Sequence, residues 1–225
     1  MMVPWQRFLK RSIDLCLAVF GLIALSWLII ICWFIAAIDT RQNGFFIQQR
    51  VGMGGRLFHL IKIRTMRPVQ GVTTVVTSRN DPRITRIGAW LRRLKLDELP
   101  QLVNVILGHM SLVGPRPDVA EFADLLQGKD RIILSIRPGI TGPATLAFRN
   151  EEELLANSEN PEQYNRWVIF PAKVRINRLY VETYSIRKDI MYILATVIPC
   201  LGGRIVHLFE PDKETRESAY THEGS

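Results

Sequence analysis

Cysteine and histidine are scarce in this chain of 225 residues, which contains three cysteines and four histidines. Cys16, Cys32 and Cys200 are too few and too scattered for a disulfide framework, so we expect the polar part of the chain to be cytoplasmic. No cluster of cysteine and histidine has the spacing of zinc ligands, which argues against a structural zinc site. Proline, the residue that most often breaks a helix, is absent from residues 5 to 67.

Charge is absent from residues 15 to 38, a run of 24 mostly apolar positions. As a helix with a rise of about 1.5 Å per residue, this run is long enough to cross a hydrocarbon core of about 30 Å. Basic residues that qualify for the cytoplasmic face flank it on both sides: Arg7, Lys10, Arg11, Arg41 and Arg50. We therefore expect residues 1–40 to form a membrane-embedded helix that enters one leaflet and returns, with a spanning helix as the alternative. Gly21 and Ser26 are the residues that could soften a re-entrant helix.

The rest of the chain is basic. Lysine and arginine total 29 against 21 aspartates and glutamates, and the formal net charge is +8. Such a surface favours anionic lipid headgroups and phosphorylated substrates. No basic-aromatic RNA motif or recognition helix is present, so nucleic acid is not an expected partner. Residues 41–211 suit one globular domain with its own core, and residues 212–225 form a charged tail that we expect to be disordered.

Alternating apolar and polar positions in residues 45–52 and 57–66 predict a small β-hairpin with a basic face. Residues 67–82 are polar, lack a helical period and end in Asp81-Pro82, which indicates a surface loop or lid.

Helical spacing dominates the remaining chain. It returns in residues 84–96, and after an acidic, polar insert at residues 150–164 it indicates one or two amphipathic helices in residues 167–201. The predicted fold is therefore mostly α with a small β-hairpin (α+β), a single cytoplasmic domain on an N-terminal membrane-embedded helix.

The stretch KLDELPQLVNVILGHMSLVGPRP, which begins at Lys95, combines adjacent carboxylates with neighbouring cations. Two acids among basic residues indicate a site for a metal and a phosphate. Asp97 and Glu98 are expected to open a helix with Pro100 in its first turn, Asp97 as the cap and Glu98 reaching inward. Taken alone, the pair is better explained as an ordinary capping acid followed by a glutamate that complements the helix dipole. Only its context favours catalysis.

Four stretches follow one another behind the apolar N-terminus: FFIQQRVG, FHLIKIRTM, NDPRITRIGAWLRRLKLDELPQLVNVILGHMSLVGPRP and RPGITG. This ordered set resembles the bacterial sugar transferase family of small monotopic phosphoglycosyltransferases, and the resemblance covers roughly residues 8 to 200. The resemblance implies transfer of a sugar phosphate from a UDP-sugar to a polyprenyl (undecaprenyl) phosphate, with release of UMP. Such a step starts an exopolysaccharide, capsule, O-antigen or glycoprotein glycan. It also implies the bacterial inner membrane, with the catalytic domain facing the cytoplasm.

The resemblance assigns different roles to the two acids. The family is understood to work through a covalent intermediate on the aspartate of its Asp-Glu pair, which corresponds here to Asp97. Glu98 matches the family residue associated with Mg²⁺. These roles agree with general chemistry, because a carboxylate is a competent nucleophile toward phosphorus and offers the hard oxygen ligand that Mg²⁺ prefers.

A carboxylate can approach a diphosphate only where cations neutralise the phosphate charge. The candidate substrate-binding and phosphate-binding cations are Lys62, Arg92, Arg116 and Arg137. Arg116 stands between two prolines that limit its backbone freedom, so it could bind a phosphate bidentately at low entropic cost. Arg137 opens RPGITG, whose glycines would let backbone N–H groups approach an anion. Lys62 and Arg92 match positions that the family retains beside its active site.

Three positions depart from the family pattern. Trp27 follows Ser26 where members usually have proline, His109 stands where an acid commonly precedes Met-Ser, and Asn177 replaces a common aspartate. The first departure weakens the argument for a re-entrant helix. The other two bear on activity or sugar preference, although both side chains can still hydrogen-bond.

Two other functions remain open. A membrane-anchored glycosyltransferase would form a glycosidic bond and release UDP, but it needs two βαβ halves and a glycine fingerprint that this sequence lacks. The second alternative function is a catalytically silent scaffold of a polysaccharide pathway. The presence of the acid pair together with its cations argues against this alternative. The sequence names neither the sugar nor the oligomeric state, for which a homodimer is one option.

Overall fold

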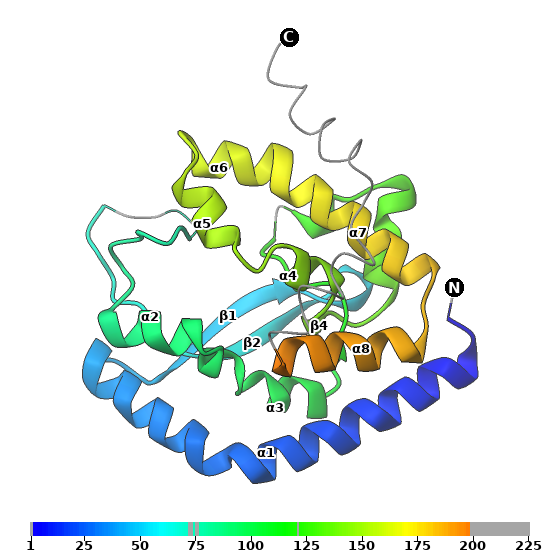
Figure 1. The fold of residues 1–225 in the computed structure, drawn as a ribbon, viewed down its shortest axis with the longest axis horizontal. Coiled ribbons are helices and arrows are strands. Elements are labelled where there is room, and N and C mark those ends of the chain that lie inside the picture. Colours follow the sequence, from blue (N-terminus) through cyan, green and yellow to red (C-terminus); the bar gives the residue numbers. More distant parts are fainter. Residues whose placement is uncertain (1, 72–73, 75–76, 121, 199–225) are drawn as a thin grey trace.

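A long helix forms the base of the domain, seen in a computed structural model that describes residues 2–198 except 72, 73, 75, 76 and 121. This helix, α1 (Pro4–Thr40), is continuous over 37 residues. Figure 1 shows α1 bent, with both arms running along the rest of the domain. Ser26 Oγ, in the middle of the helix, donates a hydrogen bond to the carbonyl oxygen of Ile23 at 3.0 Å. Because side-chain hydrogen bonds to the helix backbone favour bending, no proline is needed there.

Two apolar stripes divide the surface of α1. The first is buried against the domain and consists of Ala18, Ile29, Cys32 and Ala36. The second is exposed and consists of Phe20, Ile23, Trp27, Ile30, Phe34 and Ile38. Both follow the three-and-four spacing of a helix face. Within the described residues, α1 is the one helix long and apolar enough to cross a membrane.

Short elements make up the rest of the described chain. The strands are β1 (Phe45–Val51), β2 (Leu57–Ile63), β3 (Ser111–Val113) and β4 (Gly139–Thr141). The helices are α2 (Arg86–Arg93), α3 (Gln101–Ile106), α4 (Pro143–Ala147), α5 (Glu151–Ala156), α6 (Pro161–Tyr164), α7 (Phe170–Glu182) and α8 (Ile186–Val197). Tighter 3₁₀ turns lie at Met53–Gly55, Leu96–Glu98, Ala123–Leu125 and Gly128–Ser135.

The predicted hairpin is confirmed. Strands β1 and β2 pair antiparallel, with Phe45 opposite Ile63 and Val51 opposite Leu57. The connecting turn contains Gly54 and Gly55, whose φ angles of 71° and 81° favour glycine. Asn104 of α3 holds β2 in place, since its side chain donates to the carbonyl oxygen of His59 and accepts from the amide of Ile61, at 2.7 and 3.0 Å.

A second sheet, which the sequence did not predict, consists of the parallel strands β3 and β4. The two chain segments pass so closely that only glycine fits. A Cβ atom on Gly139 would lie 2.1 Å from the amide nitrogen of Gly114, and one on Gly142 would lie 2.3 Å from the Gly114 carbonyl oxygen. The glycines of RPGITG therefore permit strand packing, where the sequence had indicated anion binding.

The one or two amphipathic helices expected near the C-terminal end are two, α7 and α8. A π-helical turn, Asn165–Ile169, precedes α7. Pro171 explains it, because proline cannot donate to the carbonyl four residues earlier and its ring would clash with that group. The turn leads directly into the face of α7 that lines the pocket described below.

Buried polar contacts hold α1 to the domain near its N-terminal end. Lys10 Nζ lies 2.6 Å from Asp189 Oδ2 of α8, and the Tyr180 hydroxyl donates to Asp189 Oδ1 at 2.6 Å. Asp14 accepts hydrogen bonds from the Ser111 hydroxyl and the Leu112 amide at the start of β3.

Near the other end of α1, Arg67 pairs with Asp39 at 3.3 Å. Both ends of α1 are thus attached to the same domain. The predicted architecture, mostly helical with a small hairpin, is confirmed for the described residues, whereas Cys200 and the charged tail at residues 212–225 lie outside them.

Candidate active site

Lys95 turns the chain between α2 and the acid pair. Its φ of 58° lies in the left-handed region, which is uncommon for a residue with a side chain. The 3₁₀ turn Leu96–Glu98 follows, and α3 begins only at Gln101. No side chain caps either element, so the helix start and the capping role expected for Asp97 are wrong. Both acids instead face inward, with Asp97 5% exposed and Glu98 8% exposed.

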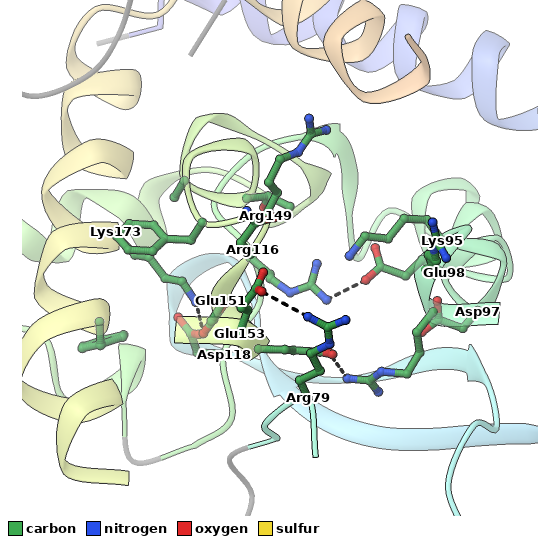
Figure 2. Close-up of a pocket in the computed structure, with 18 of the residues that line it drawn as sticks. Arg79, Lys95, Asp97, Glu98, Arg116, Asp118, Arg149, Glu151, Glu153 and Lys173 are labelled. Carbon is green, nitrogen blue, oxygen red and sulfur yellow. Dashed lines mark hydrogen bonds and ion pairs between the residues drawn. The ribbon is translucent and has the colours of Figure 1, made fainter. Parts of the chain in front are cut away.

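The acid pair lines a pocket of about 680 Å³. Figure 2 shows the charged side chains that surround it, with Asp97 and Glu98 on one side and the residues of α5 and α7 facing them. β2, α2 and the turn after β3 supply the cations next to the acids, namely Lys62, Arg92 and Arg116. Five of the six predicted site residues therefore meet in one cavity.

Glu98 is fixed between two cations. Arg116 Nη2 donates a hydrogen bond to Glu98 Oε1 at 2.6 Å, and Lys62 Nζ lies 3.9 Å from the same oxygen. Burial alone would raise the pKa of Glu98, but the charges of Arg116 and Lys62 outweigh it and hold that pKa far below its usual range. Glu98 is therefore a carboxylate at any physiological pH.

The same contacts affect the two cations in opposite directions. The charge of Glu98 raises the pKa of Arg116 above its already high ordinary value. Burial, followed by the charge of Arg116, lowers the pKa of Lys62 to about 8, although Glu98 opposes this shift. Arg116 owes its position to β3, which delivers it between Pro115 and Pro117.

Asp97 is the less neutralised acid. Its Oδ1 atom is buried and has no hydrogen-bond partner. Burial, and then the charge of Glu98, raise its pKa, while Lys62 and Arg92 act in the opposite direction. A desolvated carboxylate is more basic and is therefore a better nucleophile toward phosphorus. Adjacent acids whose pKa values shift in opposite directions are suited to different roles.

Arg92 and Arg137 have protein partners other than the acid pair. Arg92 of α2 donates to the carboxylate of Glu152 on α5. Arg137 does not reach the pocket, because its Nε atom donates to the carbonyl oxygen of Gly108 at 2.8 Å and it is not among the lining residues. The structure thus does not bring Arg137 to the acid pair, and its phosphate-binding role stays a prediction.

Sequence reasoning missed the acidic wall opposite the acid pair, formed by three consecutive glutamates at the start of α5. Each of them pairs with a cation from another element: Glu151 with Lys173, Glu152 with Arg92 and Glu153 with Arg79. Figure 2 shows the first and third of these pairs. Three acids in a row within a basic chain were a signal, but their partners lie too far away in sequence to be predicted.

Glu98, the predicted Mg²⁺ ligand, is buried and lines the pocket. Within the described part of the chain, no three histidine, cysteine, aspartate or glutamate side chains form a metal-binding group. Mg²⁺ at phosphoryl-transfer sites commonly uses one or two carboxylates together with substrate phosphates. Glu98, a buried carboxylate that lines the pocket, fits that donor set, so the metal would bind together with the diphosphate.

Comparison with known proteins places this geometry in a family. A model of the bacterial sugar transferase family matches residues 5–203. The exopolysaccharide production protein ExoY of Sinorhizobium fredii is 32% identical over 204 residues, which cover 84% of this chain and 83% of that protein. The undecaprenyl-phosphate glucose phosphotransferase of Komagataeibacter xylinus is 35% identical over 201 residues, or 86% of this chain and 36% of that protein.

The UDP-glucose:undecaprenyl-phosphate glucose-1-phosphate transferase of Escherichia coli K12 is 33% identical over 200 residues, or 85% of this chain and 40% of that protein. This chain therefore spans most of the Sinorhizobium relative but well under half of the other two. The family match includes the whole pocket, from the hairpin that carries Lys62 to α7. The chain belongs to the bacterial sugar transferase family.

Proposed function

We propose that this chain transfers a sugar 1-phosphate from a UDP-sugar to a polyprenyl phosphate such as undecaprenyl phosphate and releases UMP. The observation that carries the proposal is the buried pair of Asp97 and Glu98, which shares one pocket with the neighbouring cations Lys62, Arg92 and Arg116. The relatives support it, because the Komagataeibacter and Escherichia proteins are named for glucose and a Salmonella typhimurium relative for galactose, all with undecaprenyl phosphate. The acceptor is common to these names, and the sugar varies.

In the first half-reaction, a carboxylate oxygen of Asp97 attacks the phosphorus that carries the sugar. A phosphorus–oxygen bond to Asp97 forms, the bond to the bridging oxygen of the diphosphate breaks, and UMP leaves with the electron pair. Lys62 and Arg116 stabilise the negative charge that develops on the phosphate oxygens. Mg²⁺, held by Glu98 and the donor phosphates, would supply further charge neutralisation when bound.

In the second half-reaction, a phosphate oxygen of the polyprenyl phosphate attacks the same phosphorus. The bond to Asp97 breaks, and the carboxylate is restored as the polyprenyl diphosphosugar forms. Each half-reaction exchanges one phosphorus–oxygen bond for another, so no proton is consumed and no general base is required. A reaction that needs no general base is compatible with this site, which is rich in fixed cations and in which Asp97 attacks as a carboxylate.

The attachment of α1 supports a membrane location with the helix in one leaflet. Lys10 and Asp39, near opposite ends of α1, both contact the polar domain. A helix that crossed a hydrocarbon core of about 30 Å would carry one of these contacts to the far side. The exposed apolar stripe of α1, in contrast, has no protein partner among the described residues and suits lipid.

Helix α2, which packs beside α1, adds to this apolar surface. Ile87, Trp90 and Leu94 are exposed at helical spacing, next to the basic residues Arg86 and Arg93. Apolar and basic side chains in this arrangement suit the interface of an anionic membrane. We assign the polar domain to the cytoplasmic side of the bacterial inner membrane because both flanks of α1 are basic.

The alternative of a glycosyltransferase finds no support in the fold. Within the described residues there are two separate two-stranded sheets, and neither is part of a pair of βαβ halves. A glycosyltransferase would release UDP, so the nucleotide product separates the two functions.

The deciding experiment measures that product. Protein purified in detergent is incubated with undecaprenyl phosphate, Mg²⁺ and a panel of UDP-sugars, and UMP and UDP are separated by chromatography. We expect UMP release with at least one donor and a stoichiometric burst of UMP when the lipid is omitted. Asp97→Asn should abolish both signals. Asp130→Asn, which changes an acid outside the pocket that pairs with Arg178, is the matched control.

Release of UDP, or normal turnover by Asp97→Asn, would overturn the mechanism. Silence of the unmodified protein across the panel would favour the scaffold alternative.

A further inference from the structure

The pocket extends beyond the acid pair to a second region, which we call the helical end. There α7 presents one face to the cavity, with three-and-four spacing, made of Phe170, Lys173, Val174 and Asn177. Helix α4 packs against α7 and contributes Ala144 and Thr145. The helical end is therefore built on packed helices.

Two polar atoms at the helical end have no partner. Asn177 is only 5% exposed, and its Oδ1 atom is buried without a hydrogen bond. Thr145 Oγ1, on the neighbouring helix, is also buried and unpartnered. Leaving a buried polar atom unpaired is costly, so each such atom in a folded protein calls for an explanation. Both residues line the same cavity, so side-chain rotation on ligand binding can bring both atoms to a ligand that supplies the missing hydrogen bonds.

The charges at the helical end differ from those at the acid pair. The cation that α7 presents to the cavity, Lys173, is already neutralised, since its Nζ lies 2.6 Å from both carboxylate oxygens of Glu151. Asp118 lines the cavity nearby and adds another acceptor. The pocket faces of α4 and α7 thus offer acceptors and a paired lysine, while Arg149, just after α4, lines the cavity with an exposed side chain. The acceptors on the two helices suit a group that donates hydrogen bonds.

Hydroxyl groups of a sugar are such donors. Phe148 and Phe170 also line this region, and their rings offer apolar surface to the C–H groups of a pyranose. In the reaction proposed above, the phosphorus that Asp97 attacks carries the sugar directly. The sugar must therefore lie in the same cavity, within one phosphate group of the acid pair.

We infer that the helical end is the sugar subsite of the donor, with Asn177 Oδ1 and Thr145 Oγ1 accepting hydrogen bonds from ring hydroxyl or acylamino groups. The inference rests on the proposed function and adds the residues that discriminate between sugars. The side-chain carbonyl of Asn177 accepts hydrogen bonds as the carboxylate of an aspartate would at this position. Unlike an aspartate, it adds no negative charge beside the donor diphosphate.

The test compares binding of a UDP-sugar with binding of UMP. Calorimetry uses the Asp97→Asn protein, so that the donor is not consumed, and the UDP-sugar for which the unmodified protein releases UMP. Asn177→Leu, which removes the acceptor at similar volume, should weaken UDP-sugar binding about tenfold and leave UMP binding within about twofold. Thr145→Val should act in the same direction. Thr183→Val, the same change at the exposed end of α7 outside the pocket, should leave both affinities unchanged.

A donor analogue separates a hydrogen bond from a merely structural effect. Deoxy forms of the sugar, each lacking one hydroxyl, are bound in turn to the protein that retains Asn177 and to its Asn177→Leu variant. For the hydroxyl that Asn177 accepts, the penalty of Asn177→Leu should vanish, because the interaction is already missing. Asn177→Asp keeps an oxygen acceptor at the same position but adds a negative charge, so it should retain more UDP-sugar affinity than Asn177→Leu.

Equal weakening of UMP and UDP-sugar by Asn177→Leu would overturn the inference, since it would place the uridine at the helical end or indicate a general packing defect. Unchanged affinities in both the Asn177 and Thr145 variants would overturn it as well. Neither outcome touches the role of Asp97, which the UMP burst tests independently.

Discussion

Arg92 and Glu152, 60 residues apart in the chain, form an ion pair in the wall of the pocket. Arg92 is thus engaged by a protein carboxylate, although its position beside Asp97 suits a phosphate. A donor phosphate that binds Arg92 must compete with Glu152.

Removing this competitor should tighten donor binding. Glu152→Gln is expected to lower KM for the UDP-sugar about two- to fivefold, the range that corresponds to a partly exposed ion pair. Steady-state UMP release measures it. The control is Asp130→Asn, which breaks a partly exposed ion pair with Arg178 outside the pocket and should leave KM unchanged. A rise in KM for Glu152→Gln would mean that the carboxylate assists binding.

The position of Glu98 predicts a change in metal dependence. Glu98→Gln keeps the shape of the side chain but removes the charge, so the Mg²⁺ concentration for half-maximal UMP release should rise about tenfold or more. Chelation with EDTA should abolish the activity of the unmodified protein, and added Mg²⁺ should restore it. An unchanged Mg²⁺ titration in the variant would contradict the assignment of Glu98 as metal ligand. Glu182→Gln, in a surface pair with Arg178, is the control.

Asp81 predicts acid-sensitive stability in the segment before α2. Hydrogen bonds from the Arg83 side chain lower the pKa of Asp81, while burial opposes this shift. A pKa that is lower in the folded state means that the unfolded state binds the proton more tightly. The stabilisation is therefore present above the ordinary aspartate pKa of about 4 and is lost as the pH falls through the folded-state value.

Asp81→Asn should flatten the dependence of the unfolding free energy on pH below about pH 4. Denaturant unfolding in detergent over a pH series measures the slope. Arg83→Gln removes the partner and should flatten the dependence in the same way. The same slope in all three proteins would show that this contact does not stabilise the fold.

The buried pair of Lys10 and Asp189 predicts a large loss of stability on truncation. Lys10→Met leaves the Asp189 carboxylate without its cation and should cost about 3–5 kcal/mol. The double change Lys10→Met with Asp189→Asn should recover part of this loss, because Asn still accepts the Tyr180 hydrogen bond. Thermal unfolding in detergent provides the measurement, with Arg7→Met on the exposed side of α1 as control. A double variant no better than the single one would argue against an uncompensated charge.

Local patterns predicted the parts of the fold that depend on neighbours in the chain. The hairpin followed from alternating positions and two glycines, and α2 from its apolar spacing after Thr85, whose side chain accepts from the Gly88 amide. The pairing of β3 with β4 could not be predicted, since strands of three residues carry no periodicity. Gly114, Gly139 and Gly142 lie where the two chain segments pass each other. The need for glycine at these positions follows only from the short distance between the two backbones.

The same division holds for the site. The acids and three of the four predicted cations lie in sequence motifs and meet in the pocket, whereas Arg137, predicted from its motif, lies elsewhere. The acidic wall of α5 and the polar atoms of α4 and α7 depend on contacts across the fold. Residue types alone could not show that Arg116 and Lys62 pair with the Glu98 carboxylate, while Asp97 Oδ1 has no hydrogen-bond partner.

The attachment of α1 at both of its ends has a kinetic consequence for a lipid substrate. In the one-leaflet arrangement proposed above, a domain tied to α1 at Lys10 and Asp39 cannot swing away from the bilayer surface on a tether. The polyprenyl phosphate of the proposed reaction would then reach the enzyme by lateral diffusion within the leaflet, so its mole fraction among the lipids, and not its amount per volume of solution, would set the rate of the second half-reaction. Added inert phospholipid would slow that step even with every total concentration of enzyme and substrate held constant.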